Sequence, residues 1–143
     1  MTAIARSPAT SAEPAAARGG SVGVLVVDDS VVFRTGMTRA VQACHGLELL
    51  GEAGDGETAL RLIDELEPDL MILDLRMPAL DGLGVLERLR ASRRRGSCRV
   101  LVISATLDDV VEAELIAAGA DACLSKALSR AEICSAALRL AGR

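Results

Sequence analysis

The sequence predicts an α/β domain built around a doubly wound parallel sheet. Continuous apolar runs at residues 22–27, 70–73 and 100–103 are typical of strands that are covered on both faces. Segments with apolar residues at helical spacing separate these runs. With 143 residues, of which 50% are hydrophobic, the chain is long enough for one domain with a sizeable core.

The first half of this alternation runs as far as the strand at 70–73. The strand expected at 22–27 is followed by a helical stripe and then by residues 47–53, a more interrupted strand that we expect nearer an edge of the sheet. A second helical stripe ends at Pro68. The two stripes consist of Phe33, Met37, Ala40, Val41 and Cys44, and of Ala59, Leu62, Ile63 and Leu66.

The second half repeats the pattern and completes five strand–helix pairs. A third helix precedes the strand at 100–103, a fourth ends at Gly119 before a short strand at 120–124, and a fifth follows. Ser129 and Glu132 fit a capping box at the start of this last helix. Right-handed crossovers between five such pairs build the doubly wound sheet. The positions that define these helices are Gly82, Val85, Leu86 and Leu89; Val111, Leu115 and Ala118; and Ile133, Ala136, Ala137 and Leu140.

The composition excludes several classes of function. Phe33 is the only aromatic residue, so the chain lacks the stacking platforms on which single-stranded nucleic acids bind. A net charge of −4 gives no general attraction to DNA or anionic lipid, and no apolar run approaches the roughly 20 residues that span a bilayer. The four cysteines are widely spaced without a CxxC pair, which favours free thiols in a reducing cytosol. We therefore expect a cytoplasmic protein that binds neither nucleic acid nor membrane directly.

Polar residues follow the apolar runs at the ends where parallel strands meet. Asp28 and Asp29 follow the expected strand at 22–27, and Asp74 follows the one at 70–73. Ser104 follows the expected strand at 100–103. Lys126, the only lysine among 16 basic residues, comes after the one at 120–124. Because ligands bind beyond the carboxyl ends of such strands, we expect these side chains on one rim. Three converging carboxylates predict a hard cation, best Mg²⁺, and the cation with a lysine predicts a site for a phosphoryl group.

Five motifs stand in a fixed order along the chain: VLVVDDS, EAGDGETAL, LDLRMPALDG, VISA and GADACLSK. Together they resemble the CheY-like receiver domain of two-component response regulators. The sequences of the first three motifs are most similar to the receiver type often fused to a LuxR/NarL-like helix-turn-helix. The resemblance covers residue 22 to the C-terminus. It implies a flavodoxin-like three-layer (βα)5 sandwich with five parallel strands in the order 2-1-3-4-5.

The resemblance implies a signalling protein rather than an enzyme that turns over a separate substrate. Asp74 matches the phosphoacceptor, which takes its phosphoryl group from a sensor histidine kinase or a phosphotransfer protein. Ser104 and Lys126 match the hydroxyl and the amine that engage this group and promote its transfer and removal. The face formed by helix 4, strand 5 and helix 5 of the family is then expected to contact an unidentified downstream protein or a second copy of the chain.

The same resemblance implies Mg²⁺ as the cofactor. Asp28 and Asp29 match the acidic pair that holds the metal, and Asp74 completes the set of carboxylates. The backbone carbonyl of Arg76 matches a further ligand.

Two positions depart from the family pattern. Cys123 stands where many members carry an aromatic residue that reports the state of the hydroxyl, and a cysteine is too small for that movement. Ala127 stands where many members have a proline, often after a cis peptide bond. Because a cis bond before a non-proline residue costs about 3–4 kcal/mol, we expect a trans or a strained bond here.

Several alternatives stay open at this point. The departures keep a second hypothesis in place, a receiver-shaped scaffold that works without phosphorylation, and a phosphotransferase or phosphatase acting on small substrates is a third. We expect a disordered tail at 1–21 and a receiver domain at 22–143. Because the last helix reaches the end of the sequence, we expect no output domain in this chain, as a stand-alone regulator or as a piece of a DNA-binding one.

Overall fold

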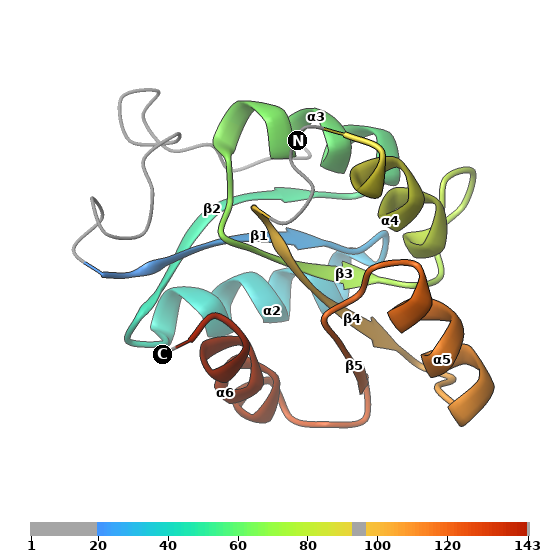
Figure 1. Ribbon diagram of the computed structural model, residues 1–143. Coiled ribbons are helices and arrows are strands. Elements are labelled where there is room, and N and C mark those ends of the chain that lie inside the picture. The colour runs from blue at the N-terminus through green and yellow to red at the C-terminus, as the bar shows by residue number, and fades with distance from the viewer. Residues whose placement is uncertain (1–19, 93–96, 143) are drawn as a thin grey trace.

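The computed structural model describes residues 20–92 and 97–142. Within them, five parallel strands form one sheet in the order β2-β1-β3-β4-β5, and helices cover both faces of the sheet (Figure 1). This is the flavodoxin-like (βα)5 sandwich that the sequence predicts. The interrupted strand β2 lies at one edge, as expected, and β5 lies at the other.

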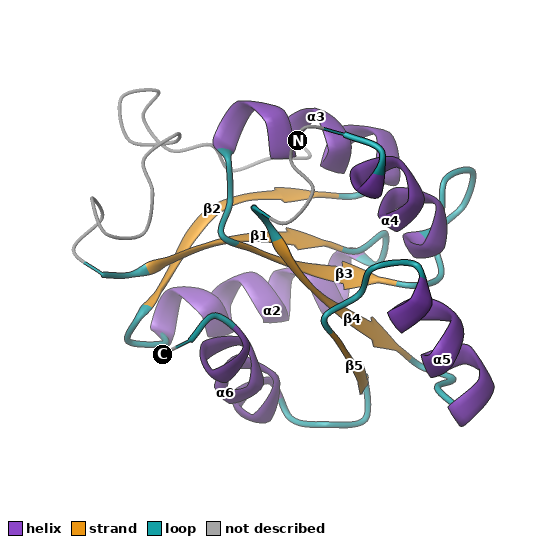
Figure 2. Ribbon diagram, in the orientation of Figure 1, coloured by secondary structure: helices purple, strands orange, loops and turns teal. Residues whose placement is uncertain are grey.

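Strands and helices alternate strictly along the chain (Figure 2). The strands are β1 (Val22–Val27), β2 (Leu47–Ala53), β3 (Leu70–Asp74), β4 (Arg99–Ser104) and β5 (Ala122–Ser125). The helices are α2 (Val31–Ala43), α3 (Gly56–Leu66), α4 (Gly82–Arg90), α5 (Asp109–Ala117) and α6 (Arg130–Leu140).

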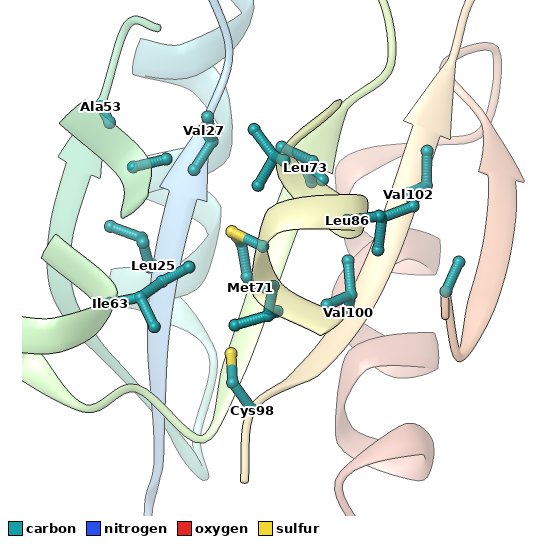
Figure 3. Close-up of a cluster of buried hydrophobic side chains, with 14 of the residues drawn as sticks. Leu25, Val27, Ala53, Ile63, Met71, Leu73, Leu86, Cys98, Val100 and Val102 are labelled. Carbon is teal, nitrogen blue, oxygen red and sulfur yellow. The ribbon is translucent and has the colours of Figure 1, made fainter. Parts of the chain in front are cut away.

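Two aliphatic cores sandwich the sheet because successive residues of a strand point to opposite faces. Val24 and Val26 pack in one core with apolar residues of α2 and α6. Leu25 and Val27 pack in the other, under α3, α4 and α5. Figure 3 shows this second core, in which Leu25 and Met71 lie among side chains of the neighbouring strands and helices.

Each helix begins at a polar residue that caps its first turn. In every case the side-chain oxygen of the N-cap residue accepts a hydrogen bond from the backbone N–H three residues further on, which satisfies an otherwise unpaired donor. At α6 the capping box predicted for Ser129 and Glu132 is confirmed. The N-cap residues are Ser30, Asp55, Asp81, Asp108 and Ser129.

Strands β3 and β4 extend by one or two residues beyond the predicted runs, and the predicted start of the last strand is wrong. This last strand begins at Ala122 rather than at residue 120. Ala120 still belongs to the turn after α5, since its N–H donates to the carbonyl of Leu115 and Gly119 has a φ of +117°. The tail predicted at 1–21 lies, apart from its last two residues, outside the described residues. None of the helices within the described ranges has the length and apolar character needed to cross a bilayer.

Candidate functional site

Three carboxylates meet at the carboxyl end of the sheet. Asp28 follows β1, Asp29 is the next residue, and Asp74 is the last residue of β3. Because β1 and β3 are neighbours, with Val27 paired to Leu73, the parallel register carries Asp28 and Asp74 to the same rim. One oxygen of each carboxylate lies within 4.8 Å of the others. The convergence predicted from the sequence is therefore present.

Burial and backbone hydrogen bonds fix the first carboxylate. Asp28 is fully buried, whereas Asp29 is exposed. The N–H of Asp28 donates to the carbonyl of Ala53 on β2, at 3.0 Å. Its Oδ1 accepts from the N–H of Ser30, at 2.8 Å, just before α2 begins. The Asp28 carboxylate is thus held by the junction between β1 and α2 rather than by side chains alone.

Lys126 lies against these carboxylates. Its backbone N–H donates to the carbonyl of Ser104, which ties the β5–α6 loop to the end of β4 at 2.9 Å. Its Nζ is 2.8 Å from Asp28 Oδ2 and 3.3 Å from Asp74 Oδ1. Burial lowers the pKa of Lys126, but the bonds and charges of the two carboxylates outweigh it, so the net direction is upward. The amine is therefore a charged ammonium at neutral pH.

The site carries more negative charge than Lys126 neutralises. Burial and the charge of Asp28 raise the pKa of Asp74 from 3.8 to about 6, against the opposing effect of Lys126. Among the described residues, Asp28 Oδ2 accepts no well-directed hydrogen bond although it is buried, and the ammonium of Lys126 is its close partner. Three hard oxygen donors with this excess of negative charge suit a small divalent cation, so the donor set fits Mg²⁺.

Two of the predicted site residues, Ser104 and Arg76, lie at the margin of the carboxylate cluster. Ser104 is fully buried at the end of β4, next to Ile103, which pairs with Asp74. Its Oγ accepts from the N–H of Thr106 at 3.1 Å, so the hydroxyl is engaged by its own turn. The N–H of Arg76 reaches Asp74 Oδ1 at a long 3.4 Å, while its side chain is exposed.

Two neighbours of the site were not predicted from the sequence. Arg34, on α2, donates from Nη1 to the carbonyl of Asp28 at 2.6 Å and from Nε to Glu52 Oε1 at 2.8 Å. Phe33 presents its ring to Lys126, whose Nζ is 4.4 Å from the ring centroid. A charged residue beside an apolar helical stripe, and a single aromatic residue shortly after Asp28, were the available signals.

The two departures from the family pattern are visible in the structure. Cys123 is buried on β5, and burial followed by the charge of Glu112 raises the pKa of its thiol to about 11. The thiol is therefore protonated and unreactive at neutral pH. Every peptide bond of the described residues is trans, including the one before Ala127, as expected.

Comparisons with known proteins agree with this geometry. The profile of the response regulator receiver domain matches residues 24–138. The nitrate/nitrite response regulator NarL of Escherichia coli K12 is 37% identical over 103 residues, which is 72% of this chain and 47% of that protein. The receiver domain of a NarL response regulator from Mycobacterium tuberculosis has a TM-score of 0.80 and 39% identity, with 86% of this chain and 98% of that one covered. CheY of Borrelia burgdorferi, in a complex with CheX, BeF3 and Mg²⁺, has a TM-score of 0.79 and 25% identity over 96% and 100% of the two chains.

The curated relatives are longer proteins. The match covers about half of the length of two of them, 47% for NarL and 52% for the response regulator GacA of Pseudomonas aeruginosa, and less of others. The profile match nevertheless covers most of this chain, and the strand order and the acidic rim agree with it. The chain therefore belongs to the response regulator receiver domain family.

Proposed function

We propose that this chain is a Mg²⁺-dependent phosphoacceptor, and that Asp74 takes a phosphoryl group from a phosphohistidine on a sensor kinase or a phosphotransfer protein. The observation that carries the proposal is the buried Asp74 carboxylate, set between the Lys126 ammonium and two further carboxylates. Family membership supports the same role. The CheY neighbour crystallised with Mg²⁺ and BeF3, a mimic of the phosphoryl group, gives further support.

Asp74 is suited to act as the nucleophile. Both of its contacts with described residues, Lys126 and the N–H of Arg76, go to Oδ1, so we assign the attack to Oδ2. A new bond forms between Oδ2 and phosphorus, the phosphorus–nitrogen bond breaks, and the histidine imidazole leaves as a neutral group after taking up a proton. With a pKa of about 6, the carboxyl group is mostly ionised at neutral pH and is able to attack.

Lys126 and Ser104 receive the transferred group. The Lys126 ammonium, already 3.3 Å from Asp74 Oδ1, neutralises charge on the phosphoryl oxygens as it arrives. Because the Ser104 hydroxyl accepts from Thr106, its own proton is available for donation to a phosphoryl oxygen.

The metal-binding residues in this proposal are Asp28, Asp29, Asp74 and the backbone carbonyl of Arg76. Bound Mg²⁺ supplies charge neutralisation for the oxygens that surround phosphorus in the transfer. The chain contributes the fixed positions of its carboxylates. Asp28 is locked by the N–H of Ser30, and Asp29 stays exposed to the incoming ion.

The response is carried by protein contacts. Lys126 lies on the β5–α6 connection and Ser104 is the last residue of β4, just before the β4–α5 connection, so their engagement with a phosphoryl group alters the surface of α5, β5 and α6. We propose this surface as the docking face for a downstream protein or for a second copy of the chain. Acting among kinases and their partners, and with four free thiols, the chain fits the reducing cytoplasm.

The test is a labelling experiment with a small phosphodonor such as acetyl phosphate. With Mg²⁺, the protein should gain one phosphoryl group, measured by intact mass spectrometry, and lose it in hydroxylamine. Asp74→Asn should not be labelled, whereas Asp64→Asn, at an exposed carboxylate on α3, should be labelled like the wild type. Equal labelling of Asp74→Asn would remove Asp74 as the nucleophile.

One observation favours the second candidate, a scaffold that works without phosphorylation. Cys123 occupies the place of the family's mobile aromatic residue and lies buried in β5, and its side chain is too small for that movement. A pull-down with and without BeF3 and Mg²⁺ separates the two functions. Partners that bind equally in both states, together with no measurable Mg²⁺ affinity, support the scaffold.

A further inference from the structure

The only aromatic ring of the chain lies between two cations. Phe33 is in the first turn of α2 and is half-buried. The Nζ of Lys126 is 4.4 Å from its ring centroid, and the guanidinium carbon of Arg130 is 5.2 Å from it. Both distances are within the roughly 6 Å over which a cation is attracted to the face of a ring. The ring therefore joins the β5–α6 loop to the first residue of α6.

The Phe33 ring restricts an otherwise flexible amine. A lysine ammonium is a point charge on a four-carbon stem, and holding it in one position loses rotamer entropy. Here Asp28 and Asp74 attract the ammonium from the side of the rim, and the ring contacts it from the side of α2. The side chain of Lys126 is only 19% exposed as a result.

The position of Arg130 depends on a glycine in the same helix. A methyl group at Gly36 would overlap the Nε of Arg130 and lie 2.6 Å from its Nη2. Gly36 is three residues after Phe33, so the two positions share one face of α2. A glycine inside a helix is destabilising by roughly 0.5–1 kcal/mol relative to alanine, and at this position it leaves the space that the guanidinium occupies.

We propose that Phe33 is a positioning residue, which holds the Lys126 ammonium in place for phosphoryl binding and couples its displacement to Arg130 at the start of α6. The inference rests on the proposed function of Lys126. When a phosphoryl group attracts the ammonium, the contact with the ring changes, and so does the contact of the same ring with Arg130. The movement of one loop side chain thereby reaches α6 without an aromatic residue at Cys123.

The chain offers an unusually direct measurement, because it has one phenylalanine and one lysine. Isotope-labelled lysine gives the NMR signals of Lys126 alone, and its ε-protons should be shifted by the ring current of Phe33. Phe33→Leu should abolish this shift, and Phe33→Tyr should retain it. This readout does not require phosphorylation. A Lys126 signal that is the same in the wild type and in Phe33→Leu overturns the proposal, whether or not Asp74 is phosphorylated.

The kinetic arm uses the same variants with acetyl phosphate and Mg²⁺. Phe33→Leu should lower the rate of labelling at Asp74 about threefold to tenfold, the range that a cation–π contact supplies when a transition state loses it. Phe33→Tyr should restore the rate, and Mg²⁺ affinity, measured by calorimetry, should be unchanged in both. An unchanged rate in Phe33→Leu, with a wild type that is labelled normally, refutes the positioning role and leaves the proposed function intact.

Gly36→Ala tests the coupling to α6. The added methyl group would overlap the Arg130 guanidinium and should displace it without removing a charge, and none of the nearest atoms to that methyl group belongs to Lys126 or Phe33. In the wild type, BeF3 with Mg²⁺ should shift the Phe33 ring signals and the amide signals of the first turn of α6. In Gly36→Ala the Phe33 signals should still shift, while the shifts in α6 should be at most half as large. Equal α6 shifts in both proteins would show that Arg130 carries no coupling.

Discussion

Two groups of charged side chains lie next to each other at the carboxyl end of the sheet, joined by the bond from Arg34 to the carbonyl of Asp28. In the first, Arg34 and Glu52 face each other one to one at 2.8 Å, and their side chains are 10% and 12% exposed. In the second, three carboxylates face the single ammonium of Lys126, 2.8 Å from Asp28 and 3.3 Å from Asp74. The first group is balanced in charge, with one carboxylate for one guanidinium. The second has an excess of negative charge.

This difference separates a structural ion pair from a functional one. The Arg34 guanidinium also donates to the carbonyl of Asp28, so the balanced pair fixes the backbone that carries the unbalanced group. The unbalanced group is costly without a further cation, since burial and the nearby charge of Asp28 disfavour ionisation of Asp74 and raise its pKa. We infer that the first group stabilises the fold and that the second binds a ligand, as proposed above.

The largest expected effect comes from breaking the balanced pair. Arg34→Met should lower the free energy of unfolding by about 3–5 kcal/mol, because it leaves the Glu52 carboxylate buried without its partner. Since the chain has no tryptophan, urea unfolding is best followed by far-UV circular dichroism. Adding Glu52→Met to Arg34→Met should recover most of the lost stability. The part due to the hydrogen bond from Arg34 to the carbonyl of Asp28 should stay lost. A single variant that loses less than about 1 kcal/mol would show that the pair is not structural.

Removing a charge from the unbalanced group should have the opposite sign. Asp74→Asn should raise the free energy of unfolding by about 2–3 kcal/mol at pH 7.5 without metal, since the pKa of Asp74 rises from 3.8 to about 6 on folding. The measurement is the same urea titration, in EDTA. The Asp64→Asn control on α3 should change stability by less than about 0.5 kcal/mol.

The pH dependence of this gain follows from the direction of the shift. A carboxyl group whose pKa is raised by folding binds its proton more tightly in the folded state. Its favourable contribution is complete below pH 3.8 and is lost as the pH rises through about 6. The wild type should therefore lose stability relative to Asp74→Asn between pH 4 and pH 7. A difference that is the same across this range would contradict the raised pKa.

Restoring the charge balance with metal should give a smaller stabilisation. At a Mg²⁺ concentration about ten times its dissociation constant, the wild type should gain about 1.4 kcal/mol over the metal-free protein. Asp29→Asn should lose most of this gain while keeping its metal-free stability, because Asp29 is exposed. The readout is the urea midpoint with Mg²⁺ or with EDTA. An equal gain in both proteins would place the metal elsewhere.

The contrast also explains which parts of the site the sequence could predict. Asp28, Asp74 and Lys126 could be placed because each follows an apolar run, and parallel strands bring such ends together. Arg34 and Phe33 could not, since their roles depend on how α2 packs against β2 and the β5–α6 loop. Helical periodicity places Phe33 on an apolar stripe but says nothing of the loop that its ring contacts.

The fold shows the same division between local and tertiary information. Buried runs and caps are encoded locally, and strands β1 and β2 have the predicted bounds. The start of β5 does not, because Asp121 is the residue that ends the turn. Its N–H and carboxylate both bond to Val100, and pairing begins only at Ala122. The start of β5 is therefore set by its pairing with β4, and the sequence of residues 119–124 alone does not determine it.

The smallest effect should come from an ion pair that resembles the first group in distance but not in burial. Arg88 Nη1 lies 3.1 Å from Glu57 Oε2, close to the separation in the buried pair, yet the two side chains are 56% and 66% exposed. Water already solvates both charges, so Arg88→Gln should change the free energy of unfolding by less than about 0.5 kcal/mol. Arg61→Gln, which removes the exposed partner of Glu65 within α3, is the matched control and should behave alike. If Arg88→Gln were as harmful as Arg34→Met in the same urea titration, distance rather than burial would set the strength of these pairs, and the contrast between the balanced and unbalanced groups would need another cause.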